Sequence, residues 1–268
     1  MKKIIILVSI VLLAVACKKA TPTPNNPSQT NVDGEKLIMV VSNNNEYLDT
    51  NKYVYDSNNK IIQIYSSSKY LPGSSNGGDY HIWKTNISSK FDSVIFDSKY
   101  TNNNNAQDQD INYIVLNQNG TINKLGTIGD KEIVLFEYSS NKLSKVSESG
   151  FFNDTSVVLN WKDENLISIG NSSFEYYLDK QNNISSVLEF VDRLGLGDGD
   201  GGFFVRGYDS GLYTKNLIKR ETYTNEDKSV DTYLYTYKFD TYGRVIERTI
   251  QNEKDASDII TYKYTWSK

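Results

Sequence analysis

Few residues of this chain have the types and spacing that catalysis or metal binding requires. His81 is the only histidine among 268 residues, and Cys17 is the only cysteine. A histidine-based triad would have to use His81, and one residue of each kind cannot form a multi-histidine or thiolate zinc site. A disulfide within the chain is excluded as well. The residues around His81 predict a strand residue on a half-exposed face, in preference to a catalytic base.

The glycine-rich stretch 194–202 superficially suggests a bound ion, because Asp198 and Asp200 alternate with glycines there. A calcium loop needs a third oxygen ligand and a terminal glutamate, and a phosphate loop needs a following Lys and Ser or Thr. Neither template fits, so a mobile loop is the favoured interpretation, and no cofactor is predicted. The run 102–105 with Asp108 and Asp110 likewise predicts a solvated loop.

The thirty-three acidic residues could in principle supply the carboxyl pair of a glycosidase. Chance pairs are expected among so many acids, and the separation that decides their chemistry is a property of the fold. A hydrolase acting on envelope or dietary polysaccharide therefore stays open as an alternative. No catalytic residue is predicted.

Two aromatic ladders near the C-terminus are the sharper binding signal. Side chains alternate between the two faces of a strand, so residues of one parity share a surface. That surface is either the buried face of a sheet, which is favoured, or an exposed platform that could stack on sugars or partner side chains. Phe239 and Ile260 continue the ladders. The candidate binding residues are Tyr233, Tyr235, Tyr237, Tyr262, Tyr264 and Trp266.

These side chains must be positioned by β-strands. From residue 37 to residue 266, apolar residues come in short alternating runs without long helical periodicity. A strand, a polar turn and a second strand recur, and Asp, Asn, Ser and Gly at the turn centres tolerate positive φ. Successive hairpins predict an all-β antiparallel meander. The repeated units are 53–64, 114–122, 135–146, 159–169, 176–187 and 237–246.

Residues 1–16 have the three regions of a secretory signal peptide: two lysines, an apolar run from residue 4 to residue 15, and a small residue before Cys17. The run is shorter than the roughly 20 residues of a spanning helix, so we expect cleavage. Residues 17–35 hold three of the four prolines and predict an extended or disordered tether. Cleavage changes the formal charge from −4 to −6, which gives no footprint for nucleic acid.

The stretch 13–17 (LAVAC) resembles the lipobox of bacterial lipoproteins, although Ala14 occupies the usual place of leucine. The resemblance implies acylation of the Cys17 thiol and a membrane anchor of more than one acyl chain. An ordinary cleaved signal is the alternative, but it would leave a free thiol in an oxidising compartment. Lys18 follows in place of the aspartate that retains lipoproteins at the inner membrane, which implies the outer membrane. Without an acidic export tag, we expect the periplasmic side rather than the cell surface.

The hairpin units resemble the tyrosine-and-aspartate repeats of bacterial wall-associated and toxin-shell proteins, most closely at 237–244 (YKFDTYGR). Anchor, tether and hairpins together resemble envelope lipoproteins of Bacteroidota that carry a domain of unknown function described as porin-like in fold. The resemblance covers 36–268 and implies a large curled antiparallel sheet or partial barrel. Polar faces and the lack of clean apolar bands favour a water-soluble domain over a membrane-spanning barrel.

Two functions therefore stay open. The favoured one is a non-catalytic envelope lipoprotein that binds or scaffolds a protein or a glycan, and the other is the polysaccharide hydrolase. The membrane, reached through the lipid, and a protein or glycan are the expected partners, and the oligomeric state is not predicted.

Overall fold

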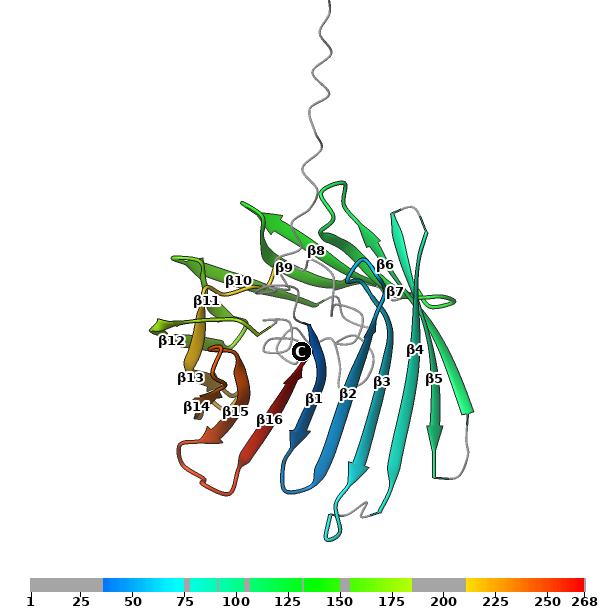
Figure 1. Ribbon diagram of the computed structural model, residues 1–268. Helices are drawn as coiled ribbons and strands as arrows, with labels where there is room; N and C mark the ends of the chain where they lie inside the picture. The colour runs from blue at the N-terminus through cyan, green and yellow to red at the C-terminus, as the bar shows by residue number, and fades with distance from the viewer. Residues whose placement is uncertain are drawn as a thin grey trace, which may run out of the picture.

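In the described part of the chain, sixteen antiparallel strands form one sheet that closes into a barrel (Figure 1). The computed structural model describes residues 36–74, 78–90, 92–103, 107–131, 133–149, 155–184 and 211–267. Every strand is hydrogen-bonded to its sequence neighbours, and β1 also pairs with β16. The strands are β1 Leu37–Asn43, β2 Tyr47–Tyr55, β3 Ile61–Tyr70, β4 Tyr80–Lys90, β5 Ser93–Asn102, β6 Gln107–Leu116, β7 Ile122–Thr127, β8 Ile133–Ser139, β9 Lys142–Ser149, β10 Thr155–Lys162, β11 Asn165–Ile169, β12 Ser172–Gln181, β13 Asn216–Thr224, β14 Val230–Phe239, β15 Val245–Asn252 and β16 Ile259–Trp266.

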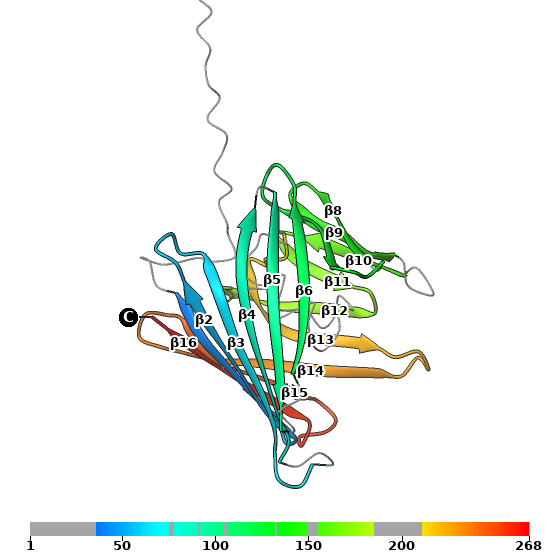
Figure 2. The ribbon, with the colours of Figure 1, turned by 90° about the vertical axis from the view of Figure 1, so that its right-hand side faces the viewer.

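The predicted all-β antiparallel meander is confirmed, and the sheet goes further than a curled sheet or partial barrel because it closes. The direction of the strands changes strongly around the wall. In Figure 2, β4 to β6 run nearly vertically while β12 to β14 run nearly horizontally. Such a change follows from the right-handed twist that accumulates from strand to strand. No helix in the described part of the chain is long and apolar enough to cross a membrane.

Four hairpin turns share one five-residue geometry, which explains the recurring Asp and Asn of the sequence. The first residue donates its N–H to the fifth carbonyl over 2.8–3.0 Å, and the fourth donates to the first carbonyl over 2.9–3.2 Å. The fourth residue has positive φ, as a turn followed by a bulge requires. The turns are 56–60, 117–121, 225–229 and 240–244, and their fourth residues are Asn59, Gly120, Lys228 and Gly243 with φ of 64°, 85°, 68° and 79°.

The turn that follows β14 shows how the first residue stabilises this geometry. The Asp240 carboxylate accepts hydrogen bonds from the backbone N–H groups of Tyr242 and Arg244, each at 2.9 Å, and from Arg244 Nε at 2.6 Å. Burial would raise the pKa of Asp240, but these hydrogen bonds and the Arg244 charge outweigh it, so the pKa lies below its usual range. The carboxylate therefore stays ionised and holds the turn.

Two local predictions are wrong. Over its described residues, the unit 176–187 does not form a hairpin, because β12 continues to Gln181, residues 182–184 lie in no strand, and the next partner of β12 is β13. Residues 185–187 lie outside the described part of the chain. Asp108 and Asp110 do not lie in a loop: both are exposed residues of β6, paired with Tyr100 and Ser98 of β5. The polar composition around Asp108 and Asp110 wrongly indicated a loop, because the exposed end of a strand tolerates charged side chains.

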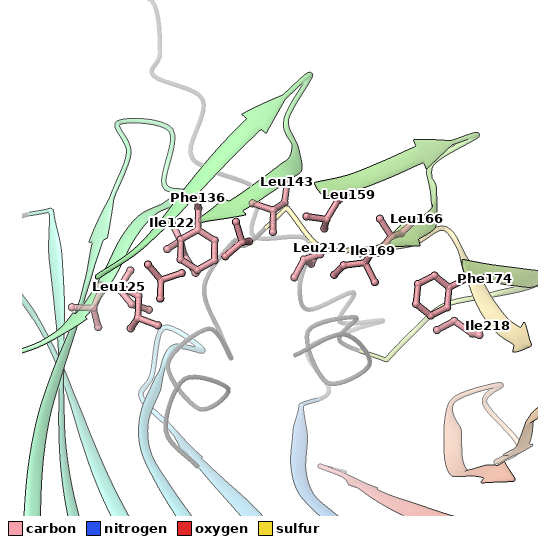
Figure 3. Packing of buried hydrophobic residues seen from close by; sticks show 14 of the residues in the cluster. Ile122, Leu125, Phe136, Leu143, Leu159, Leu166, Ile169, Phe174, Leu212 and Ile218 are labelled. Carbon is pink, nitrogen blue, oxygen red and sulfur yellow. The ribbon is translucent and has the colours of Figure 1, made fainter. Parts of the chain in front are cut away.

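The apolar core lines the inner wall of the barrel. Buried side chains from strands on different sides of the barrel pack into two clusters, which is possible only if they point inward. The larger cluster follows β5 to β14, and Figure 3 shows part of it. The smaller one joins β1, β2, β3, β13, β15 and β16. Ile184 and Leu212, which lie outside the strands, are 5% and 0% exposed and complete these clusters.

The two-residue turn between β10 and β11 offers a test of the local geometry. Asp163 and Glu164 have φ of 50° and 65°, a conformation that costs a residue with a side chain about 1 kcal/mol relative to glycine. We expect Glu164→Gly to raise the free energy of unfolding by about 1 kcal/mol in urea denaturation. The control Glu164→Ala keeps the strain and loses only an exposed ion pair with Lys215, so it should stay within about 0.5 kcal/mol of the parent. Equal effects of the two substitutions would contradict this account of the turn.

Candidate functional site

The aromatic ladders predicted as a binding face pack into the core. Tyr235 and Tyr264 are each 4% exposed and belong to the two apolar clusters. The remaining four candidates, Tyr233, Tyr237, Tyr262 and Trp266, are partly buried and pack against those clusters. Phe239, the last residue of β14, pairs with the buried Val245 of β15 and is 38% exposed at the end of the ladder.

A buried carboxylate on β13, next to the β14 ladder, accepts hydrogen bonds from hydroxyl groups. Glu221 is 1% exposed, and its two oxygens accept hydrogen bonds from Tyr235 Oη at 2.8 Å and Ser172 Oγ at 2.7 Å. On the neighbouring strands, the guanidinium of Arg248, also 1% exposed, lies 4.2 Å from the ring centre of Tyr262. These polar groups are built into the packed wall and are positioned to stabilise it.

A second group of rings lies on the inner wall at β3 to β5, apart from both apolar clusters. Tyr70, His81, Trp83 and Tyr100, here called the ring cluster, are all half-buried. The His81 ring stacks on Trp83 with 5.7 Å between ring centres and 16° between planes, and Tyr70 meets His81 edge-on at 6.0 Å. Tyr100 lies 5.3 Å from Trp83 and 5.5 Å from His81, with its hydroxyl hydrogen-bonded to His81 Nδ1. His81 is thus a half-exposed strand residue, as expected, and it also belongs to the ring cluster.

The register of the strands surrounds the ring cluster with small polar side chains. Ser66 pairs with Trp83, and Ser68 and Asn102 pair with His81. Asp108 pairs with Tyr100, and its side chain is exposed. Between the rings and the apolar core, the Thr85 and Ser98 hydroxyls are buried and hydrogen-bonded over 2.9 Å. A polar band therefore separates the ring cluster from the core.

The charges of this wall are divided between its two sides. Alternation places Lys69, Lys84 and Lys99 on the outer face of β3 to β5, where each is exposed. The inner rows that hold the rings contain carboxylates and no lysine or arginine among the described residues of β2 to β6. The inner surface beside the rings is therefore neutral to acidic.

The other sequence candidates do not join this site. Cys17, Asp198 and Asp200 lie outside the described residues. Within the described part of the chain, no three His, Cys, Asp or Glu side chains lie close enough together to hold a metal ion.

Sequence reasoning missed Tyr70, Trp83 and Tyr100 as partners of His81. The one local signal is that His81, Trp83 and Thr85 have the same parity in a strand. Which residues of β3 and β5 lie beside them depends on the strand register, which single-strand periodicity does not specify.

The fold is similar to that of a solved structure, a porin-like protein from Bacteroides uniformis ATCC 8492. The TM-score is 0.60 at 15% sequence identity, over 86% of this chain and 98% of that chain. The two chains share a fold. A second porin-like protein, from Bacteroides vulgatus ATCC 8482, matches over the same shares at 12% identity with a TM-score of 0.35, too low to support an argument. No protein-family model and no curated protein matches the sequence.

The structural similarity confirms the porin-like fold that the sequence resemblance implied. At this identity it concerns the fold alone. Membership in the tyrosine-and-aspartate repeat family, the lipid anchor and the binding role stay predictions.

The buried Glu221 network provides a test of how this wall is stabilised. Tyr235→Phe removes a hydroxyl donor from a carboxylate that is 1% exposed, so we expect the free energy of unfolding to fall by about 1.5–3 kcal/mol in urea denaturation. Tyr242→Phe, in the turn after the same strand, is the control, because Tyr242 is 77% exposed and should change stability by less than about 0.5 kcal/mol. Similar results for the two variants would show that the hydrogen bond contributes nothing.

Proposed function

We propose that this protein is a non-catalytic lipoprotein of the bacterial outer membrane that is anchored through Cys17. In this proposal the barrel stands in water, on the periplasmic side, and binds or scaffolds a partner. The lipobox-like stretch 13–17 and the tether support the anchor, and the porin-like fold is compatible with an envelope protein.

The observation that carries the proposal is a row of lysines across the outside of the barrel. Lys52 of β2 pairs with Tyr65 of β3, Tyr65 with Lys84 of β4, and Lys84 with Lys99 of β5. All four side chains are exposed, and the lysines lie in the interior of their strands rather than at the ends. The Lys84 ammonium lies 5.6 Å from the ring centre of Tyr65, a contact that suits a wet surface.

Charges also continue on the outer wall at β14 to β16, on the other side of β1. Lys238 of β14 forms an ion pair of 2.6 Å with Glu247 of β15, and Glu247 is paired in register with the exposed Lys263 of β16. A lysine that faces lipid near the middle of a bilayer costs about 2–4 kcal/mol, and spanning barrels carry an apolar outer band instead. This exterior suits water, so the barrel needs another means of staying at a membrane, which a lipid on Cys17 would supply.

The hydrolase alternative gains no specific support from the geometry. Glu221 is the only acidic residue that is buried in the described part of the chain, and both its oxygens are engaged by hydroxyl groups of the wall. Asp108 and Asp110 lie two residues apart in the exposed first half of β6. A binding role requires no further chemistry from these residues.

Cell fractionation tests the anchor and the water-facing barrel together. The wild-type protein should sediment with the outer membrane and carry a diacylglyceryl group on Cys17 in mass spectrometry. When an ordinary secretory leader replaces residues 1–16 and Ser replaces Cys17, we expect the whole domain in the soluble periplasmic fraction. Protease added to intact cells should leave the wild-type domain uncut.

Thr21→Ser with the native leader is the matched control and should behave as the wild type. A Cys17→Ser protein that still resists extraction from the membrane by alkaline carbonate would contradict the water-facing barrel. An unmodified Cys17 in the wild-type protein would contradict the anchor, and cleavage on intact cells would place the domain on the surface.

A further inference from the structure

We propose that the ring cluster is a binding site for a neutral saccharide. This inference rests on the proposed binding role, gives it a site and a ligand class, and uses no residue of the aromatic ladders near the C-terminus. The site consists of Tyr70, His81, Trp83 and Tyr100 on the inner faces of β3, β4 and β5.

These rings are held in place without being part of the core. Trp83 and His81 are stacked, Tyr100 packs beside both, and the Tyr100 hydroxyl fixes the orientation of the His81 ring. None of the four rings belongs to either apolar cluster, and the hydroxyls of Thr85 and Ser98 lie on their core side. A preorganised and half-exposed aromatic surface loses little side-chain entropy when it binds a ligand.

The two remaining tryptophans provide a contrast. Trp161 donates its indole N–H to the Leu143 carbonyl over 2.7 Å, and Trp266 donates to the Val245 carbonyl over 2.9 Å. Both rings pack against the apolar clusters. Their positions are explained by the core of the barrel, whereas the position of Trp83 is not.

Polar side chains surround the rings. The inner side chains in register with Trp83 are Ser66 and Tyr100, and those in register with His81 are Ser68 and Asn102. Ser66 Oγ donates a hydrogen bond of 2.7 Å to Asn51 Oδ1, and this bond holds the Asn51 amide beside Ser66. Hydroxyl, amide and carboxylate groups that alternate with apolar ring faces match the sugar surface, in which C–H faces alternate with hydroxyl groups.

The charges beside the ring cluster favour a neutral ligand. Asp49 pairs with Ser68, and Asp108 pairs with Tyr100, so carboxylates lie at both sides of the ring cluster. The lysines of these strands face outward. Phosphate, sulfate or uronate groups would meet like charge there, whereas sugar hydroxyls can donate to carboxylates. A basic peptide is the competing ligand that the acidic groups allow, and the experiment below separates the two.

The ring cluster lies toward the hairpin end of the barrel that is opposite the entry of the chain. Tyr70 ends β3 next to Tyr47, its partner at the start of β2, while Lys36 and Ser267 are hydrogen-bonded to each other at the other ends of β1 and β16. The described chain therefore begins at the end of the barrel away from the rings.

Indole N–H signals in nuclear magnetic resonance spectra test the proposal on the mature chain. The three tryptophans give three signals, and Trp83→Phe identifies that of Trp83. The probes are cellotetraose, mannotetraose, xylotetraose, chitotetraose, tetragalacturonate and tetralysine. At least one neutral tetrasaccharide should shift the Trp83 signal and leave those of Trp161 and Trp266 in place, while tetragalacturonate should not bind.

Two variants of inner-facing rings and one variant of an outer-facing ring define the site. Trp83→Ala and Tyr100→Ala should each weaken binding of the active saccharide on the order of tenfold in calorimetry. Tyr80→Ala is the matched control, because Tyr80 lies on the same strand but faces outward and is exposed. It should leave the affinity unchanged. If Trp83→Ala does not fold, Trp83→Tyr should fold and show an intermediate loss.

The remaining outcomes overturn the proposal. Binding of tetralysine alone, lost in Asp108→Asn, would replace the saccharide by a basic peptide and would leave the binding role of the barrel intact. Saccharide binding that Tyr80→Ala abolishes would place the site on the outer wall. No response of Trp83 to any probe would reject the site, whereas the anchor and the water-facing barrel are tested separately by fractionation.

Discussion

The pairing of β1 with β16 is the constraint on which the rest of the structure depends. An open sheet of this size would end in two strands with unpaired N–H and C=O groups, whereas closure gives every strand two neighbours. The barrel is reinforced at the end where β1 begins: Lys36 and Ser267 exchange two hydrogen bonds of 2.7 Å, and Tyr55 Oη donates to the Leu37 carbonyl over 2.6 Å. Burial, and secondarily Tyr53, raises the pKa of Tyr55 above its usual range, so this hydroxyl remains a donor.

Closure also divides the side chains into an inner and an outer set, and the two sets have different tasks. A barrel of sixteen strands is wide, so its own wall does not fill the interior evenly. Apolar side chains gather along β5 to β14, where Leu212 joins them from outside the strands. Toward one end of β3 to β5, the inner wall is lined instead by polar residues and the ring cluster. The outer faces of the same strands carry the exposed Lys69, Lys84 and Lys99.

The local features of the fold could be predicted from the sequence, and the non-local ones could not. Alternation predicted the inward parity of Tyr235 and Tyr264, and the polar turn centres predicted five of the six hairpin units. The sixth failed because β12 finds its partner far along the chain in β13. The meeting of His81 with Tyr100 depends on the register of β4 against β5. Period-two patterns are identical for an open and a closed sheet, so closure was beyond sequence reasoning.

Residue-resolved amide hydrogen exchange along β1 tests closure most directly. In an antiparallel strand, successive residues bond alternately to the neighbour on either side. Residues 39–43 have partners on both β2 and β16, so the account predicts slow exchange at every amide of this run. Slow exchange at alternate residues only, with fast exchange at those between them, would show that β1 is an edge strand and that the barrel is open.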